Sequence, residues 1–217
     1  MERIVETDGR RPACTSCLRP QSACICRWIR LTAHQAEVLI LQHPLEVAHT
    51  KGSARLLHLS LARSRLVTGE VFAEPDLQAL LTGAFNPELG APPRQAVLLY
   101  PDLPQDRALG LPAPPALEPA YLQDPSRLRL VVLDGTWRKS RRMLHANPLL
   151  QQLPRLPLQD LPASHYLIRK ARRPDQLSTL EATCAALAQL EAGIEKFQPL
   201  LTAFDGFVAQ QLGYRAT

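Results

Sequence analysis

The chain has 217 residues, of which 46% are hydrophobic and 21% charged, which excludes a disordered chain and is typical of a globular protein with one substantial core. No stretch approaches the roughly 18 apolar residues of a membrane span, and residues 1–17 lack the apolar segment of a secretory signal, so we expect a cytoplasmic protein with no membrane partner. The net charge of +5 fits nucleic-acid binding, although a basic protein without a polyanionic partner fits it equally well.

Four of the five cysteines lie near the N-terminus, at Cys14, Cys17, Cys24 and Cys26. Two close pairs of thiolates can supply four tetrahedral ligands to one Zn²⁺ ion, and a reducing compartment favours a metal over disulfides. Because four thiolates leave no open coordination position, such a zinc would be structural. Free surface thiols or a redox C-x-x-C pair are the alternatives. The fifth cysteine, Cys184, lies among Ala and Leu and is expected in the core.

Apolar runs typical of buried strands alternate with helical patterns along the rest of the chain. Strands are expected at 37–42, 66–72, 96–100, 129–133 and 165–169, and helices at 50–64, 76–81, 138–145, 178–190 and 195–212. Ser178 and Glu181 form an S-x-x-E capping box that marks one helix start. Strands separated by helices favour an α/β fold, with a mainly parallel sheet and helices on both faces.

Seven of the twenty prolines fall within residues 101–125. Proline lacks an amide hydrogen and fixes φ, so neither a regular helix nor a central strand is expected there. Because strand-like runs flank this segment on both sides, we interpret it as a long loop within one sheet. The expected organisation is an N-terminal tail and zinc knuckle over residues 1–33, followed by one catalytic domain over residues 34–217.

The motif Asp134-Gly135-Thr136-Trp137 directly follows the clearest predicted strand. Ligands of open α/β sheets bind beyond the carboxyl ends of the strands, where a carboxylate can act as a base and a glycine lets the backbone approach a ligand. Asp134 as the N-cap of the next helix is an equally weighted alternative. Trp137 suits stacking on a base or an adenine, and equally a core position that anchors the helix.

Two basic runs lie beside the predicted strand ends, and they consist of Arg138, Lys139, Arg141 and Arg142, and of Arg169, Lys170, Arg172 and Arg173. Few acidic residues in the same segments neutralise them. Such runs suit a phosphate backbone that crosses one edge of the sheet, although a charged run is more often a solvated surface.

Taken together and in this order, the motifs resemble those of the DTW-domain family. The resemblance covers roughly residues 14 to 190 and rests on the cysteine pattern, Gln42-His43-Pro44-Leu45-Glu46, Leu99-Tyr100-Pro101, Asp134-Gly135-Thr136-Trp137 and Leu177-Ser178-Thr179-Leu180-Glu181-Ala182. This family is related to the SPOUT group of RNA-modifying enzymes, which implies a knotted α/β fold with a C-terminal trefoil knot. General folding rules would make such a knot very improbable.

The resemblance implies a tRNA-uridine aminocarboxypropyltransferase, because the family's characterised members transfer the 3-amino-3-carboxypropyl group of S-adenosylmethionine to N3 of a tRNA uridine. The methionine γ-carbon bonds to that nitrogen, methylthioadenosine leaves, and the variable loop of the tRNA is the expected place. Uracil N3–H is a poor nucleophile, so a base must remove its proton, and Asp134 is the candidate.

The resemblance also implies binding residues for S-adenosylmethionine and for tRNA, and it implies no protein partner. The expected S-adenosylmethionine contacts are Leu99, Tyr100, Pro101, Leu133, Gly135, Thr136, Trp137, Ser178, Thr179 and Glu181. The expected tRNA contacts are Arg55, Arg138, Lys139, Arg141, Arg142, Arg169 and Lys170. The positive N-terminus of the helix that starts at Ser178 is expected to receive the amino-acid carboxylate.

Two other functions stay open on the sequence. One is a SPOUT-like RNA methyltransferase, which would release S-adenosylhomocysteine instead of methylthioadenosine. The other is a zinc-knuckle RNA-binding protein without catalysis. His43 and Glu46 follow a predicted strand and can reach the site, but a structural role is the favoured interpretation of His43.

Overall fold

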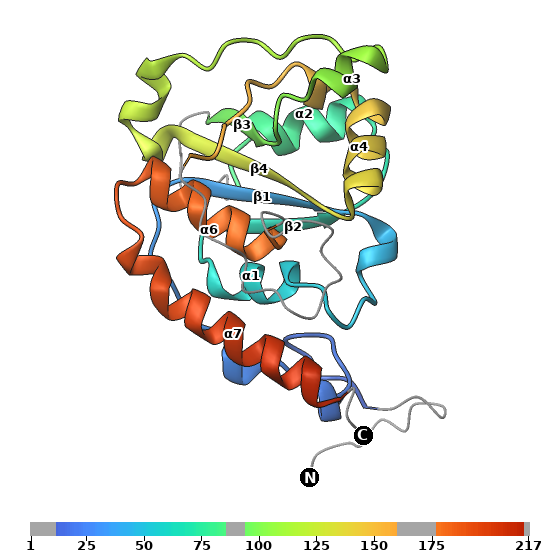
Figure 1. Ribbon diagram of the computed structural model, residues 1–217, viewed down its shortest axis with the longest axis vertical. Coiled ribbons are helices and arrows are strands. Elements are labelled where there is room, and N and C mark those ends of the chain that lie inside the picture. The colour runs from blue at the N-terminus through green and yellow to red at the C-terminus, as the bar shows by residue number, and fades with distance from the viewer. Residues whose placement is uncertain (1–11, 86–93, 160–176, 215–217) are drawn as a thin grey trace.

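The computed structural model of the chain describes residues 12–85, 94–159 and 177–214. Four parallel strands form one sheet in the order β2-β1-β4-β3 (Figure 1). The strands are β1 (Glu37–Gln42), β2 (Ser64–Thr68), β3 (Gln95–Leu99) and β4 (Leu128–Asp134). The predicted α/β fold with a mainly parallel sheet is therefore confirmed.

The two central strands, β1 and β4, are buried along their whole length, which explains their nearly continuous apolar sequences. Their register pairs Gln42 with Asp134 at the carboxyl edge of the sheet. The second predicted strand, 66–72, begins earlier and ends earlier than expected, because β2 covers Ser64–Thr68. The predicted strand 165–169 lies outside the described residues.

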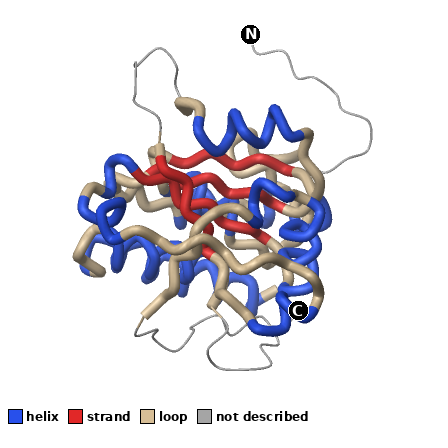
Figure 2. The backbone as a smooth tube through the Cα atoms, turned by 90° about the horizontal axis from the view of Figure 1, so that it is seen from above, coloured by secondary structure: helices blue, strands red, loops and turns tan. Residues whose placement is uncertain are grey.

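Helices cover both faces of the sheet, as Figure 2 shows from above. On one face α1 (Ala54–Ser60), α6 (Thr179–Leu190) and α7 (Gln198–Gly213) share a core with alternate residues of the central strands, such as Ile40 and Val132. The opposite face packs Leu41 and Val131 against another set of helices, which comprises α2 (Glu74–Thr82), α4 (Trp137–Ala146) and α5 (Pro148–Gln151).

The helices agree with the sequence predictions in type, and they differ in length. The predicted helix 50–64 is too long, because only Ala54–Ser60 are helical and β2 already begins at Ser64. The capping box of α6 is confirmed, since the side chains of Ser178 and Glu181 each bond the other residue's backbone N–H. No helix in the described ranges is long and apolar enough to cross a membrane.

The proline-rich segment joins β3 to β4, two neighbouring strands of the sheet, so the interpretation as a loop within one sheet is confirmed. The expectation that it holds no helix is wrong for one short stretch, α3 (Pro104–Ala108), and one 3₁₀ turn at Pro119–Gln123. Pro104 and Pro119 each begin their helical turn, where a missing amide hydrogen costs nothing.

The N-terminal cysteine segment packs against α7, at the lower end of the molecule in Figure 1. Cys17 and Ile25 of this segment are buried in the core cluster that α6 and α7 also form. Gly206 of α7 makes this contact possible, because a Cβ at that position would lie 2.2 Å from the ring of Trp28. The side chain of Trp28 also donates a hydrogen bond of 2.5 Å to Gln210.

Candidate active site

Asp134 joins three elements at the carboxyl edge of the sheet. Its side chain ends β4 and is buried, and its Oδ2 accepts a hydrogen bond of 2.9 Å from Nε2 of Gln42 at the end of β1. Its Oδ1 accepts one of 2.7 Å from the hydroxyl of Thr179 at the start of α6. Both oxygens act as acceptors, which suits an ionised carboxylate. The backbone carbonyl of Asp134 accepts a third bond, from the amide of His43.

Asp134 is not the N-cap of α4, so that alternative is wrong. The N-cap is Thr136, whose Oγ1 accepts a hydrogen bond of 3.4 Å from the amide of Lys139. Gly135 lies in the tight turn between the two, where a Cβ would be 3.0 Å from the Cβ of Lys139. The turn therefore needs a glycine because the backbone passes close to the first turn of α4.

A pocket of about 110 Å³ lies beside this turn. Its walls come from the ends of β3 and β4 and from the first turns of α4 and α6, and they consist of Leu99, Tyr100, Pro101, Val132, Leu133, Gly135, Trp137, Ser140, Leu177, Ser178, Thr179 and Ala182. Eight of the ten residues that the sequence predicted for S-adenosylmethionine line it. Thr136 and Glu181 do not, and Asp134 adjoins the pocket through Thr179 rather than lining it.

Four lining residues were missed by the sequence reasoning, and they are Val132, Ser140, Leu177 and Ala182. Helical spacing could have found two of them. Ser140 lies three residues after Trp137, and Ala182 lies four after Ser178, so each shares a helix face with a predicted neighbour.

The side chains of Ser178, the N-cap of α6, and of Ser53 already accept hydrogen bonds from backbone N–H groups at the N-terminus of α6. The amide of Glu181 donates to Oγ of Ser178 (3.2 Å), and the amide of Leu180 donates to Oγ of Ser53 (3.3 Å). Oε2 of Glu181 accepts from the amide of Ser178 at 2.7 Å. The amides of Leu180 and Glu181 therefore already have acceptors, and the carboxylate site expected at this helix end stays a prediction.

Trp137 lies at the rim of the pocket, and its side chain is 46% exposed. Its ring meets that of Tyr100 edge to face, with centroids 5.8 Å apart and an interplanar angle of 71°. A buried role as core anchor of α4 is therefore wrong. An exposed indole that is held by its contact with Tyr100 can stack on a planar ligand.

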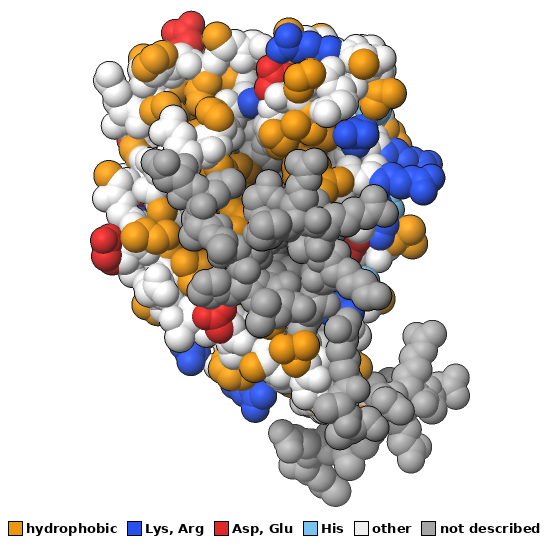
Figure 3. All heavy atoms as spheres, in the orientation of Figure 1, with side chains coloured by type: hydrophobic (Ala, Val, Ile, Leu, Met, Phe, Trp, Pro, Cys, Tyr) orange, Lys and Arg blue, Asp and Glu red, His pale blue; other side chains and the backbone are white. Residues whose placement is uncertain are grey.

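Basic side chains gather over α4, as Figure 3 shows on its right-hand side. Two of them form ion pairs with acids from distant loops. Nζ of Lys139 lies 2.8 Å from Oε1 of Glu46, which follows β1, and Nε of Arg141 lies 3.0 Å from Oδ1 of Asp106, which follows β3. The acids that neutralise this run are remote in sequence, and the tertiary fold brings them close to α4.

Glu70, which follows β2, pairs with two more residues. It lies 2.5 Å from Nε of Arg142 and 2.7 Å from Nε2 of His43. His43 is buried, and its Nδ1 accepts a hydrogen bond from the amide of Leu45, so Nε2 carries the hydrogen that Glu70 accepts. This geometry agrees with the structural interpretation of His43. Arg138 is exposed and has no ion pair among the described residues.

The remaining predicted tRNA contacts lie elsewhere. Nη2 of Arg55 on α1 donates a hydrogen bond of 2.7 Å to the carbonyl of Ser16, in the cysteine segment. Arg169 and Lys170 lie outside the described residues. The structure therefore brings together the basic residues of α4 and places Arg55 beside a different element.

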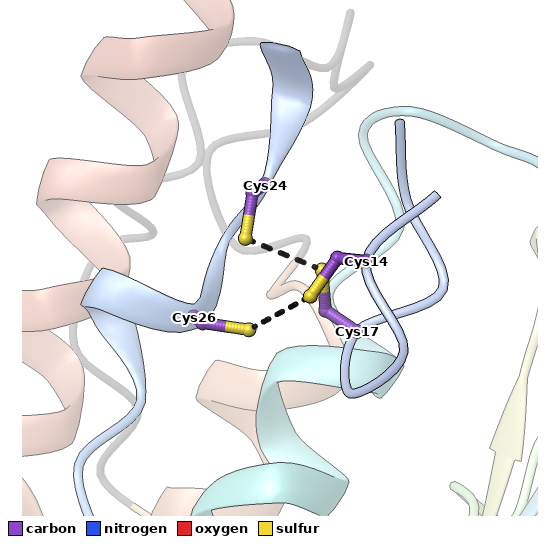
Figure 4. Close-up of side chains that lie close together, drawn as sticks. All are labelled: Cys14, Cys17, Cys24 and Cys26. Carbon is purple, nitrogen blue, oxygen red and sulfur yellow. Dashed lines mark hydrogen bonds between the residues drawn. The ribbon is translucent and has the colours of Figure 1, made fainter. Parts of the chain in front are cut away.

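The four N-terminal cysteines converge from two turns of the chain (Figure 4). The sulfur atoms of Cys14 and Cys26 lie 3.6 Å apart and those of Cys17 and Cys24 lie 3.8 Å apart, and all four are within 4.8 Å of one another. Tetrahedral zinc with Zn–S bonds of about 2.3 Å requires sulfur atoms about 3.8 Å apart, so the cluster fits Zn²⁺. Cys184 is buried in the core, as expected.

The thiols of this cluster differ in acidity. Backbone N–H groups of Cys17 and Ser16 lower the pKa of Cys14 to about 6. Burial, with added contributions from the neighbouring thiols, raises the pKa of Cys26 to about 12. A divalent cation would remove this conflict, because it stabilises four adjacent thiolates. No residue of the cluster lines the pocket, which fits a structural ion.

The model of the DTW domain family matches residues 11–212. A protein named tRNA-uridine aminocarboxypropyltransferase 2 from Drosophila melanogaster is 30% identical over 212 residues, which covers 94% of this chain and 76% of that protein.

Two further relatives carry similar names. A tRNA-uridine aminocarboxypropyltransferase 2 from Macaca fascicularis is 29% identical and covers 99% of this chain and 68% of its own length. A tRNA-uridine aminocarboxypropyltransferase A from Arabidopsis thaliana is 29% identical and covers 69% of this chain and 56% of its own length. No solved structure matches the chain.

Proposed function

The chain belongs to the DTW domain family, and from that premise we propose that it is a tRNA-uridine aminocarboxypropyltransferase. It transfers the 3-amino-3-carboxypropyl group of S-adenosylmethionine to N3 of a uridine in the variable loop of tRNA, and methylthioadenosine leaves. The observation that carries this proposal is the similarity, over nearly the whole chain, to relatives that bear this name. The pocket at the carboxyl edge of the sheet supports it.

The pocket is the proposed binding site of S-adenosylmethionine, which supplies an electrophilic methylene carbon beside its sulfonium. Apolar walls from Leu99 and Leu133 suit the adenosine portion, and the hydroxyl groups of Ser140, Ser178 and Thr179 offer hydrogen bonds. Their arrangement at strand ends and helix starts is the usual place for a ligand in an open parallel sheet.

Asp134 is the proposed base, and Thr179 connects it to the pocket. The hydroxyl of Thr179 lies in the pocket wall and already donates its hydrogen to Oδ1 of Asp134. When the uracil N3–H bond breaks, the proton passes to Oγ1 of Thr179 while the hydroxyl hydrogen passes to Asp134. The freed nitrogen electron pair forms the new C–N bond, and the electrons of the C–S bond leave on sulfur. Gln42 holds the other carboxylate oxygen in place.

The exposed basic side chains of α4, Arg138 and Arg142, are the proposed contacts of the tRNA backbone near the pocket. Lys139 and Arg141 contribute their charge from within ion pairs. Arg55, Arg169 and Lys170 stay proposed contacts, and Trp137 is proposed to stack on a planar ring. The proposal also includes S-adenosylmethionine contacts from Tyr100, Pro101, Gly135, Thr136 and Glu181.

Three structural features belong to the same proposal. The fold is SPOUT-like with a C-terminal trefoil knot, and it divides into the knuckle region 1–33 and the catalytic domain 34–217. The four cysteines hold a structural Zn²⁺ ion, which their spacing fits. The enzyme works in the cytoplasm, where tRNA and S-adenosylmethionine are both present.

The test is a reaction of the purified protein with unmodified tRNA and S-adenosylmethionine, followed by mass spectrometry of nucleosides and small molecules. Methylthioadenosine and a uridine that gains the aminocarboxypropyl group are expected. S-adenosylhomocysteine with a methylated nucleoside would instead identify an RNA methyltransferase. Salt-sensitive tRNA binding without either product would identify a non-catalytic RNA-binding protein.

A further inference from the structure

A charged cluster adjoins the pocket at Tyr100, a residue of the pocket wall. The guanidinium carbon of Arg155 lies 5.5 Å from the centre of the Tyr100 ring. Arg141 and Asp106 form an ion pair of 3.0 Å, and the Asp106 side chain is 8% exposed. Electrostatic interactions connect these charges to the phenol of Tyr100. We call Tyr100, Asp106, Arg141 and Arg155 the Tyr100 cluster.

The position of Arg155 is fixed by the backbone. The amide of Leu98 on β3 donates to the carbonyl of Pro154 at 2.9 Å, and the carbonyl of Leu98 accepts from the amide of Leu156 at 3.0 Å. Residues 154–156 thus extend the outer edge of β3 as a short parallel bridge. Arg155 is therefore held beside Tyr100 by the sheet.

The Tyr100 cluster carries more positive than negative charge. Arg141 and Arg155 face one carboxylate, Asp106. The other nearby acid, Asp102, forms an exposed ion pair of 2.6 Å with Arg107. Burial lowers the pKa of Arg155, so its charge is held in surroundings that disfavour it. A partly buried charge without a counterion costs free energy unless a bound anion neutralises it.

Three donors in the cluster, Nη1 of Arg155, the hydroxyl of Tyr100 and Nε of Arg141, are buried and donate no hydrogen bond within the described part of the chain. Nε of Arg141 faces Asp106 in the ion pair, whereas the other two donors have no acceptor there. Burial, with the charge of Asp106, raises the pKa of Tyr100 against the opposing hydrogen bond and charge of Arg141, so the phenol keeps its proton at neutral pH and that hydrogen can be donated to an acceptor. Buried donors without acceptors are uncommon in folded proteins and point to a missing partner.

We propose that the Tyr100 cluster binds the anionic group of the pocket ligand, with Arg155 and Tyr100 as the donors that select it. The inference rests on the proposed function, in which that group is the carboxylate of the aminocarboxypropyl moiety. A guanidinium and a phenol together suit a planar oxyanion. The N-terminus of α6 is the competing position, but side chains already occupy its Leu180 and Glu181 amides. A tRNA phosphate offers the same chemistry, and the test separates the two sources.

The experiment measures binding by calorimetry, without turnover, for S-adenosylmethionine and for its decarboxylated analogue, which lacks only the carboxylate. Arg155→Met is expected to weaken S-adenosylmethionine binding by roughly 10-fold to 100-fold, since a hydrogen bond to a charged group is lost, and to leave the analogue unchanged. Tyr100→Phe removes only the hydroxyl, so a purely structural role predicts no loss, whereas the proposal predicts about tenfold. Arg107→Met, at the exposed ion pair, is the matched control.

Each result of these binding measurements has a different meaning for the Tyr100 cluster. If tRNA binding and its salt dependence weaken in Arg155→Met while discrimination between the two small molecules persists, the anion is a phosphate of tRNA. If discrimination and tRNA binding both match the wild type in Arg155→Met and in Tyr100→Phe, the cluster is structural and the inference is overturned. If the wild type binds neither small molecule, the proposed function itself fails.

Discussion

The hydroxyl of Thr179 donates a 2.7 Å hydrogen bond to Oδ1 of Asp134, and so ties the first residue of α6 to the last residue of β4. Thr179 lines the pocket and Asp134 does not. The carboxylate at the end of β4 is therefore connected to the pocket through a hydroxyl group of α6.

Thr179→Val, which removes the hydroxyl and keeps the shape, should slow aminocarboxypropyl transfer by roughly 10²-fold to 10⁴-fold, the usual contribution of general acid–base catalysis. Thr179→Ser keeps the hydroxyl and should retain most of the rate. The measurement is single-turnover release of methylthioadenosine, with affinity for S-adenosylmethionine measured in parallel. A Thr179→Val enzyme with wild-type rate would remove Thr179 from the proton route.

Asp134→Asn should abolish transfer while leaving tRNA binding nearly intact. The amide oxygen can still accept from Thr179, and Gln42 can turn its own amide to accept from the new NH₂ group, so the geometry survives and the negative charge is lost. Product formation and tRNA affinity should be compared with the wild type. Substantial transfer by Asp134→Asn would show that the base lies elsewhere.

Gly206→Ala should loosen the cysteine segment from α7. A Cβ at this position would lie 2.2 Å from the ring of Trp28, and overpacking of this kind costs about 1–3 kcal/mol. Urea unfolding and zinc content report the effect. Gly213→Ala in the same helix is the control, because nothing lies within 4 Å of a Cβ there. Equal stabilities of the two variants would contradict the close contact.

Arg129→Met should destabilise the fold by about 3–5 kcal/mol, since the buried carboxylate of Glu37 would lose its hydrogen-bonded partner and keep only Arg94, whose Nε lies 3.6 Å from Oε1. Arg129 is fully buried on β4, its Nε lies 3.0 Å from Oε2 of Glu37, and it also donates to the carbonyls of Leu80 and Gly83. Chemical denaturation measures the loss.

Arg107→Met, which breaks the exposed pair with Asp102, should cost only about 0–1 kcal/mol in the same assay. A similar loss of unfolding free energy in both variants would mean that burial does not determine how much the Arg129–Glu37 pair contributes to stability.

The free energy of unfolding should fall as pH drops below about 6.5, in part because of His34. Burial lowers the pKa of His34, although the backbone carbonyl of Ala36 and Glu191 oppose the shift and Arg63 and Lys196 add to it. Its Nε2 accepts a hydrogen bond from the amide of Arg63, which protonation would break. The unfolded chain then binds the proton more readily than the folded one, so acid favours unfolding.

Urea unfolding at about pH 7.5 and about pH 5.5 measures this contribution. His34→Asn cannot gain a proton in that range, so the difference between the two pH values should shrink. His145→Asn, at an exposed position of α4, is the control. An unchanged pH dependence in His34→Asn would assign the effect to other groups, such as His58, whose pKa is also lowered by burial.

The sequence by itself determined most of the helices and strands and the motifs that contribute to the pocket. Strand β1, the capped start of α6 and the turn after β4 carry local signals, namely a buried apolar run, an S-x-x-E pair and a glycine beside a polar strand end. Parallel strands bring their carboxyl ends together, so motifs that each follow a strand meet at one edge. Eight of the residues that the resemblance implies for S-adenosylmethionine line one pocket, and those that follow β3 and β4 meet there for this reason.

Only the tertiary structure decided which charged side chains form ion pairs and which polar side chains form hydrogen bonds with one another. Glu46, Glu70 and Asp106 follow three different strands and pair with cations of α4 far along the chain. Thr136 rather than Asp134 caps α4, because Asp134 is held by Gln42 and by Thr179. Periodicity and propensity describe contacts within a few residues, whereas these partners lie tens of residues apart, and their pairing follows from the order of strands in the sheet.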